Sequence, residues 1–580
     1  MKRIFALLFL MLSPVSAQLI SASGTKIFGV YESSGNLYGV AAELAVELHS
    51  GSGRVFVDTT PLTKIDTQAS ARLSKQVACE TLKVNCSAYD FFYIIRSPVQ
   101  MIGGPSAGSA MTVLTLVVLT NSTAKDNVGI TGTINPDGSI GQIGSVYEKA
   151  LSAKDSGVDI FLVPRGQAGF SINGVEVIEI SKITDAFYYL TGRQIVRQQA
   201  NTTKVRQDYE ELMKAMAVQL LDYSSYRISE LENITVLLED NVLIAVFDEI
   251  ISASRELLTD ALSFYNDAQY YSASSFLVQS SFNSVFGYNM AGFEISNRTK
   301  DFVNLRHSAV SSKFYQLDAM FTEDVRIASI NDAELLATSI SRLRESELML
   351  KNATYSLSID DYESALYYLS FAEVRMKSAE IWFSTLGRFP DSINTTLSEA
   401  DLADSAQLAI ERSQDAITYA DTIVSNIFSE SSHEAFSNAL SAYDNRNYIY
   451  CIFEALQARA LANLAMEVRA LDEEQLLLTL GEKQEQALIS IQEAESKGVL
   501  PILALSYLEY SKDLQQKGDL ASALIYSAYS KEFSTLSDFL VSVPEASEGV
   551  SVADSFSKDM DILTVMFIGA VIGFLLSKRL

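Results

Sequence analysis

The chain has 580 residues, with 71 acidic side chains against 44 Lys and Arg, for a formal net charge of −27 at pH 7. A phosphate backbone would be repelled by this charge, so nucleic acid is excluded as an expected partner. The length allows two or three domains, and the three histidines and three cysteines have no metal-site spacing, so neither a metal nor another cofactor is expected.

The N-terminus, residues 1–17, is predicted to be a signal peptide. Two basic residues precede an apolar stretch, and a small-x-small pattern ends at Ala17. Export would bring the chain into an oxidising compartment. Cys79 and Cys86, seven residues apart, are therefore predicted to form a disulfide.

Residues 23–194 mix short β-type runs with helical patterns, which predicts an α+β domain. The strand candidates are KIFGVYE, LYGVAAELAVEL, GRVFVDTT, DFFYIIR and VDIFLVP. The helix candidates are TQASARLSKQVACETL, SAGSAMTVLTLVVLT and SVYEKALSAKDSG. Between them, INPDGSI carries the Pro-Asp-Gly signature of a hairpin turn.

Residues 203–543 have the sequence pattern of long amphipathic helices, with few glycines and very few prolines. Four related segments begin near Tyr270, Tyr362, Tyr448 and Leu520 and resemble the second helix of tetratricopeptide-like hairpins. Their spacing is irregular, so we expect an all-α region of helical hairpins or a long bundle. Arrays of this kind usually act as scaffolds or binding surfaces.

The C-terminal end is predicted to be a linker, residues 544–560, then one transmembrane helix, 561–577, and a cytoplasmic tail, 578–580. The helix candidate has no polar face, which disfavours the alternative of a buried amphipathic tail helix. Lys578 and Arg579 would stay inside, so we expect a single-pass cell-membrane protein with its other domains extracytoplasmic.

The stretch GGPSAGSAMTV places Ser106 directly after Pro105, at the start of an apolar helix. A serine here is either a helix cap or a nucleophile. In the second case the free N–H groups of the helix would stabilise the oxyanion that forms on the substrate carbonyl. Gly103 and Gly104 permit the turn before it, and Ala107 is small enough for close approach of a substrate backbone.

A serine nucleophile needs a base, and Lys149 is the candidate. It lies at the margin of the apolar stripe of its predicted helix, where desolvation would favour the neutral amine. The alternative without a catalytic role is a lysine whose side chain extends its ammonium into water. A Ser-His-Asp triad is the competing catalytic interpretation, but His49 is the only histidine in this domain and no G-x-S-x-G motif is present.

Three motifs follow one another along the chain: PSAG at Ser106, TG at Thr131, and a lysine helix followed by a strand that ends in proline. This order resembles the proteolytic domain of the Lon protease family, the serine-lysine peptidases. The resemblance covers about residues 23–194 and is nearest to the secreted, membrane-anchored Lon-like proteases of archaea. It implies that Ser106 is the nucleophile, that Lys149 is the general base 43 residues later, and that Thr131 supports the lysine. Many family members carry an acidic residue where this chain has Gly103.

The family members that unfold their substrates carry a phosphate-binding loop, G-x-x-x-x-G-K-[ST], which this sequence lacks. The sequence therefore predicts a membrane-anchored, extracytoplasmic, ATP-independent serine endopeptidase that cleaves unfolded or flexible polypeptides. Lon-type domains often form rings, so the resemblance also implies that this protein could form a homo-oligomer. The alternative is a surface helical scaffold or partner-binding protein whose Lon-like domain is inactive.

Overall fold

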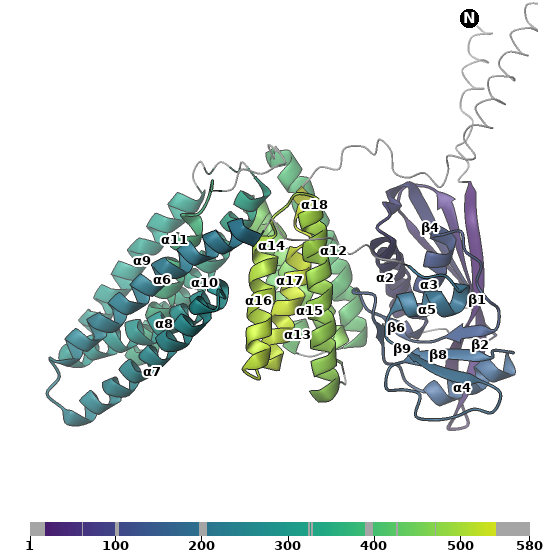
Figure 1. The fold of residues 1–580 in the computed structure, drawn as a ribbon, viewed down its shortest axis with the longest axis horizontal. Helices are drawn as coiled ribbons and strands as arrows, with labels where there is room; N and C mark the ends of the chain where they lie inside the picture. Colours follow the sequence, from purple (N-terminus) through teal and green to yellow (C-terminus); the bar gives the residue numbers. More distant parts are fainter. Residues whose placement is uncertain are drawn as a thin grey trace, which may run out of the picture. The chain divides into compact units, whose positions relative to one another are not determined.

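The computed structural model describes residues 18–60, 62–98, 104–195, 206–322, 325, 327, 329–388, 398–424, 427–469, 471 and 473–540. An α+β part comes first along the chain, in purple to blue, and a helical part follows, in teal to yellow (Figure 1). Several predicted features lie outside the described residues: the signal peptide 1–17, the linker 544–560, the transmembrane segment 561–577, the tail 578–580 and Gly103.

The α+β part alternates strands and helices much as the sequence patterns predict. Its elements are β1 (Leu19–Ser33), β2 (Asn36–Ser50), β3 (Val55–Thr60), α2 (Ile65–Leu82), the 3-10 turn η1 (Cys86–Ala88), β4 (Tyr89–Arg96), the 3-10 turn η2 (Pro105–Ala107), α3 (Gly108–Leu119), β5 (Val128–Ile130), β6 (Thr133–Ile134), β7 (Ile140–Gly141), α4 (Val146–Asp155), β8 (Ile160–Pro164), β9 (Glu176–Ile180) and α5 (Ile183–Thr191).

The larger sheet has the order β1-β2-β4-β3, in which β3 pairs parallel to β4 and the other pairs are antiparallel. Alternate residues of β4, among them Phe91, Tyr93 and Ile95, are fully buried, as expected of a strand with one face on the core. A second, parallel sheet has the order β5-β8-β9. The predicted hairpin is confirmed, because β6 pairs antiparallel with β7 around the Pro-Asp-Gly turn.

Helix α3 runs through the core of this part, and every residue from Gly108 to Val118 is buried. Such a helix shows no amphipathic stripe, since all of its faces meet apolar neighbours. Its buried threonines find partners inside the fold: the Thr115 hydroxyl donates to the Met111 carbonyl oxygen, 2.7 Å away, and lies 2.8 Å from the Tyr93 hydroxyl. The element that follows Ser106 is therefore rigidly packed.

A disulfide joins Cys79, near the end of α2, to Cys86 in η1, with their Cα atoms 6.2 Å apart. Cys451 is a free, buried cysteine of the helical part. The disulfide fixes the short connection from α2 to β4.

The helical part consists of long helices joined mostly by short turns. Its elements are α6 (Arg206–Thr235), α7 (Asn241–Asn266), α8 (Tyr270–Ile295), α9 (Lys300–Thr322), α10 (Ile330–Ser358), α11 (Tyr362–Phe383), α12 (Glu399–Ile423), α13 (Ile427–Asp444), α14 (Tyr448–Glu467), α15 (Glu473–Ser496), α16 (Ile502–Gln516), α17 (Leu520–Phe533) and α18 (Ser537–Leu540).

The four related sequence segments occupy equivalent places in this part. They begin α8, α11, α14 and α17, and each of these helices packs against the helix just before it in the chain. A residue with positive φ stands in the turn ahead of each: Ala268, Asp360, Arg446 and Gly518. The shared pattern of a polar turn, an aromatic or aliphatic residue and a small residue is thus the pattern of a tight turn entering a packed helix.

Contacts between distant helices bind the hairpins together. The carboxylate of Glu334 on α10 accepts hydrogen bonds from the backbone N–H groups of Ile502 and Leu503, at 3.2 and 2.6 Å. The first N–H groups of a helix have no acceptor within the helix, so Glu334 caps α16 from 168 residues away. Helix α8 also packs against α16, and α10 against α14.

The fold-class prediction is wrong in its last element. The α+β domain and the all-helical region are present, but in the part of the chain that the structure describes no helix is long and apolar enough to cross a membrane. The uncharged run from Ile562 to Ser577 has 16 residues, fewer than the about 20 that a spanning helix needs. The single-pass location predicted from that run is corrected with it.

Candidate active site

Ser106 lies in η2, the 3-10 turn that leads directly into the buried helix α3. Ser106 is half-buried, whereas every residue of α3 from Gly108 to Val118 is buried. Gly104, two residues earlier, has φ of 103°, a conformation that glycine adopts without strain. The serine therefore stands at the accessible start of a rigid helix, which is where the sequence pattern places it.

The backbone of Ser106 is held by the segment Thr131–Gly132, between β5 and β6. Its carbonyl oxygen accepts hydrogen bonds from the Gly132 N–H at 3.0 Å and from the Thr131 hydroxyl at 3.4 Å. The Thr131 N–H donates to the carbonyl oxygen of Leu162 on β8. Thr131 thus ties the serine turn to the parallel sheet, and among the described residues it makes no hydrogen bond to the lysine that the resemblance assigns to it.

Two glycines allow this close approach. A Cβ on Gly108 would lie 2.9 Å from Cγ2 of Ile134, and one on Gly132 would overlap Cγ2 of Ile140. Gly132 also has φ of 153°, which side chains rarely tolerate. Packing and backbone conformation therefore both favour glycine at position 132.

Lys149 lies on α4, whose Val146, Ala150 and Ala153 pack against Phe28 and Phe161. Lys149 itself is 4% exposed. Among the described residues its ammonium has no ion pair or hydrogen bond. Burial lowers its pKa from 10.5 to about 8, because the charged form loses its hydration.

The side chains of Ser106 and Lys149 are not joined by a hydrogen bond among the described residues. Catalytic hydrogen bonds are often long or poorly aligned until substrate binds. Both residues belong to the same α+β part: α4 packs against β1, and β1 also packs against η2. The described residues thus place a buried lysine without a polar partner among them and a half-buried serine in one domain, and their catalytic pairing remains a prediction.

Asp66, in the first turn of α2, is a site residue that sequence reasoning missed. Its Oδ2 accepts a hydrogen bond of 2.9 Å from the N–H of Gly104, two residues before the serine. A carboxylate therefore reaches the serine turn from another element of the fold. An acidic residue in the first turn of a helix is ordinary, so the sequence offered no signal for this contact.

His49 does not form a triad in this structure. On β2, its Nε2 lies 2.9 Å from Oε2 of Glu47, and its ring contacts the Phe92 ring. Within the described residues, no cluster of three His, Cys, Asp or Glu side chains could hold a metal ion.

The comparisons with known proteins identify the class of this site. Residues 95–176, which include Ser106, Thr131 and Lys149, match the family model of the Lon protease (S16) C-terminal proteolytic domain. This stretch of the α+β part is thus similar to a Lon-type proteolytic domain, and the family recognised from the sequence, the Lon-type proteases, is confirmed.

Individual relatives cover the same short region. The chain is 44% identical over 61 residues to a Lon protease of Buchnera aphidicola, over 10% of this chain and 8% of that protein. It is 35% identical over 77 residues to Lon protease 1 of Herpetosiphon aurantiacus, over 13% and 9%. It is 29% identical over 156 residues to a Lon protease of Helicobacter pylori, over 26% and 18%. The chain thus spans less than a fifth of the length of these relatives, and they give no support to an extracytoplasmic location.

Proposed function

We propose that the α+β part is an endopeptidase in which Ser106 is the nucleophile and Lys149 the general base. The observation that carries the proposal is the state of Lys149: it is buried, has no ion-pair or hydrogen-bond partner for its ammonium among the described residues, and has a pKa lowered to about 8 by burial, in a domain of Lon type. A lysine acts as a base only when part of it is neutral near the working pH, and burial supplies that condition.

The reaction proceeds in two halves. The neutral Nζ of Lys149 takes the hydroxyl proton as Oγ of Ser106 bonds to the carbonyl carbon of the scissile peptide. The C–N bond then breaks, and the leaving amine takes the proton from the Lys149 ammonium, which leaves an acyl-enzyme. Water next gives a proton to Lys149 and attacks the ester, and Ser106 regains its proton when the carboxylic acid product leaves.

The turn around Ser106 supports the developing oxyanion. The start of a helix leaves N–H groups without intrahelical acceptors, and its dipole favours negative charge there. Because Thr131, Gly132 and Asp66 fix this turn through its backbone, its N–H groups need no rearrangement during the reaction.

The substrates are unfolded or flexible polypeptides, and the reaction needs no nucleotide. The sequence contains no phosphate-binding loop of the kind that drives unfolding. Without such a motor, a stably folded protein would present no extended segment to the serine.

The test is labelling by a serine-reactive phosphonate, followed by peptide mapping. We expect the label on Ser106, its loss in Ser106→Ala, and a rate of labelling that falls strongly in Lys149→Met. Lys154→Met is the matched control, because Lys154 is an exposed lysine on the same helix. Labelling that persists in Ser106→Ala would refute the dyad, and a wild type that neither reacts nor cleaves unfolded protein would favour the alternative of a helical scaffold with an inactive domain.

A further inference from the structure

A cavity of about 600 Å³ lies among helices of the helical part. Its walls come from α6, α8, α10, α11, α14, α16 and α17, among others, and are strongly aromatic. The aromatic lining includes Tyr271, Tyr507, Tyr510, Tyr526, Tyr529 and Trp382. The volume falls in the range of pockets that hold small ligands, about 300 to 1,000 Å³.

Arg342 on α10 lines this cavity and is only 8% exposed. Its Nε donates to the Ser378 hydroxyl at 3.1 Å, and its Nη1 donates to the Thr338 carbonyl oxygen at 3.4 Å. The guanidinium carbon lies 5.0 Å from the centre of the Trp382 ring. Among the described residues, no carboxylate forms an ion pair with Arg342.

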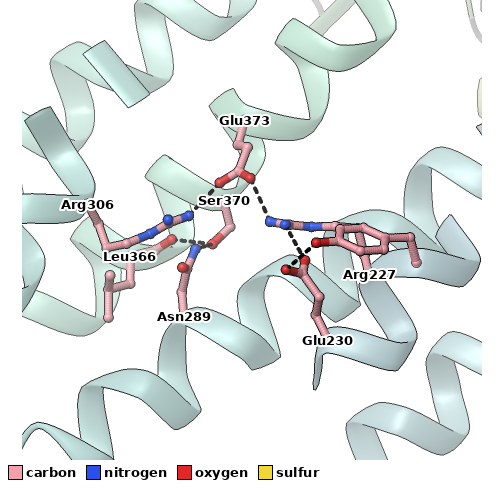
Figure 2. Close-up of polar contacts among 8 residues, drawn as sticks. Arg227, Glu230, Asn289, Arg306, Leu366, Ser370 and Glu373 are labelled. Atoms are coloured by element: carbon pink, nitrogen blue, oxygen red, sulfur yellow. Dashed lines mark hydrogen bonds and ion pairs between the residues drawn. The ribbon is translucent and has the colours of Figure 1, made fainter. Parts of the chain in front are cut away.

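Among the described residues of the helical part, the other two arginines that are as deeply buried, Arg227 and Arg459, have carboxylate partners. Figure 2 shows Arg227 between Glu230 and Glu373, at 2.5 and 2.6 Å, with Arg306 sharing Glu373 at 2.6 Å. In the same way, Arg459 pairs with Glu532 at 2.8 Å. The fold thus satisfies a buried guanidinium with a carboxylate elsewhere, which makes the arginine of the cavity an exception.

An unpaired buried charge is unfavourable, because it loses hydration and gains no opposite charge in return. A lysine can escape this penalty by losing its proton, as the lowered pKa of Lys149 illustrates. Arginine cannot, since its guanidinium stays charged in proteins. The charge of Arg342 thus has no carboxylate partner among the described residues, and this favours an anion in the cavity that it lines.

The rest of the lining indicates what the anion is attached to. The second arginine of the cavity, Arg375, is already paired with Glu345 at 2.5 Å, so one positive charge remains. The amide side chains of Gln279, Asn283 and Gln457 also line the walls. Amide groups bind peptide N–H and C=O groups, and the aromatic walls favour apolar side chains.

We propose that this cavity binds the C-terminal end of a short apolar peptide, with its carboxylate on the guanidinium of Arg342. The planar fork of arginine matches a carboxylate with two parallel hydrogen bonds. The tyrosines and Trp382 enclose the last side chains, and the three amide side chains hold the backbone. This site does not depend on the dyad, although cleavage by a peptidase would generate such carboxylate ends.

The full chain carrying Ser106→Ala tests the proposal, since its peptide binding is then free of cleavage by the proposed serine. The probes are N-acetyl-Ala-Leu-Phe with a free C-terminal carboxylate, the same peptide as its C-terminal amide, and 3-phenylpropanoate. Trp382 is the only tryptophan of the chain, so its emission reports on the cavity. We expect saturable binding of the acid, and binding about tenfold or more weaker for the amide and for 3-phenylpropanoate.

In the same background, Arg342→Met is expected to weaken binding of the peptide acid about tenfold or more while leaving the amide unaffected. Arg255→Met is the matched control, because Arg255 is an exposed arginine on α7 that does not line the cavity. Near-UV circular dichroism checks that each variant keeps its packing. The acid and amide comparison in unaltered cavities stands even if Arg342→Met does not fold.

Three results would overturn the proposal. Equal affinity for the peptide acid and the peptide amide would show that Arg342 does not bind the carboxylate. Equal affinity for 3-phenylpropanoate and the peptide acid would show that the amide side chains do not hold a peptide backbone. Absence of any saturable change with the peptide acid would show that the cavity does not take this ligand.

Discussion

Replacing Lys149 by methionine is expected to change stability and activity in opposite directions. Burial lowers the pKa of Lys149 from 10.5 to about 8 in the folded protein. That difference corresponds to about 3 kcal/mol of lost stability at pH 7, because one pKa unit is worth about 1.4 kcal/mol. Methionine has a similar length and no charge, so Lys149→Met removes the penalty while it removes the proposed base.

The sign of the pH dependence follows from which state binds the proton. Between pH 8 and pH 10.5 the unfolded chain holds the Lys149 proton and the folded chain does not. The cost of burying the ammonium is therefore fully present below pH 8 and disappears as the pH rises through 10.5. The stabilising effect of Lys149→Met should accordingly be largest at pH 7 and small above pH 10.

Urea unfolding at pH 7 and at pH 10 measures the stability effect, and hydrolysis of an unfolded protein measures activity. With a pKa of about 8, about a tenth of Lys149 is neutral at pH 7 and about nine tenths at pH 9, so wild-type kcat/KM should rise about tenfold between them. Lys154→Met, on the same helix but exposed, should change neither quantity. The reasoning is wrong if Lys149→Met lowers stability at pH 7, or if wild-type activity is flat from pH 7 to pH 9.

Three further outcomes are expected. Asp66→Ala should lower kcat at least tenfold. Asp66→Asn should lower it much less, because the side-chain oxygen of asparagine still accepts the hydrogen bond from the N–H of Gly104. Equal losses of kcat in steady-state kinetics would contradict this. Gly132→Ala should destabilise the domain by about 1 to 3 kcal/mol in urea unfolding, since its Cβ would overlap Ile140 at a strained φ; an unchanged midpoint would count against it. Mass spectrometry without reductant should find Cys79 linked to Cys86, and reduction should cost about 2 to 3 kcal/mol of stability; two free thiols would disprove the linkage.

Features set by short stretches of sequence were predictable. The β-type runs became strands of the two sheets, and the Pro-Asp-Gly signature became the β6–β7 turn. Ser106 stands at the start of a buried helix because proline, small residues and an unbroken apolar run are adjacent in the chain. Lys149 is buried because its neighbours on one helical face are Val and Ala. Each of these results depends on residues within about two helical turns of one another.

Features set by distant contacts were not predictable in the same way. Asp66 reaches Gly104 across 38 positions, and the parallel placement of β3 beside β4 follows from how the chain crosses over the sheet. Arg342 looks in the sequence like any charged residue of an amphipathic helix. Whether a carboxylate lies beside it depends on which helices surround it, and no local sequence pattern indicates that none does among the described residues. The predicted membrane anchor depended on the composition of an uncharged run that is short for a span, and among the described residues no helix is long and apolar enough to cross a membrane.

The cap that Glu334 places on α16 limits how this helical part could have evolved. In a solenoid each repeat contacts only its neighbours, so repeats can be gained or lost by duplication and deletion. Here α16 begins on a carboxylate supplied by α10, and α8 packs against α16 as well. Loss of α10 would leave α16 without this cap, and loss of α8 would uncover the face of α16 against which it packs. The hairpins that contain α8, α10 and α16 are therefore expected to be retained together, so that a repeat could not be deleted from this set without loss of stability.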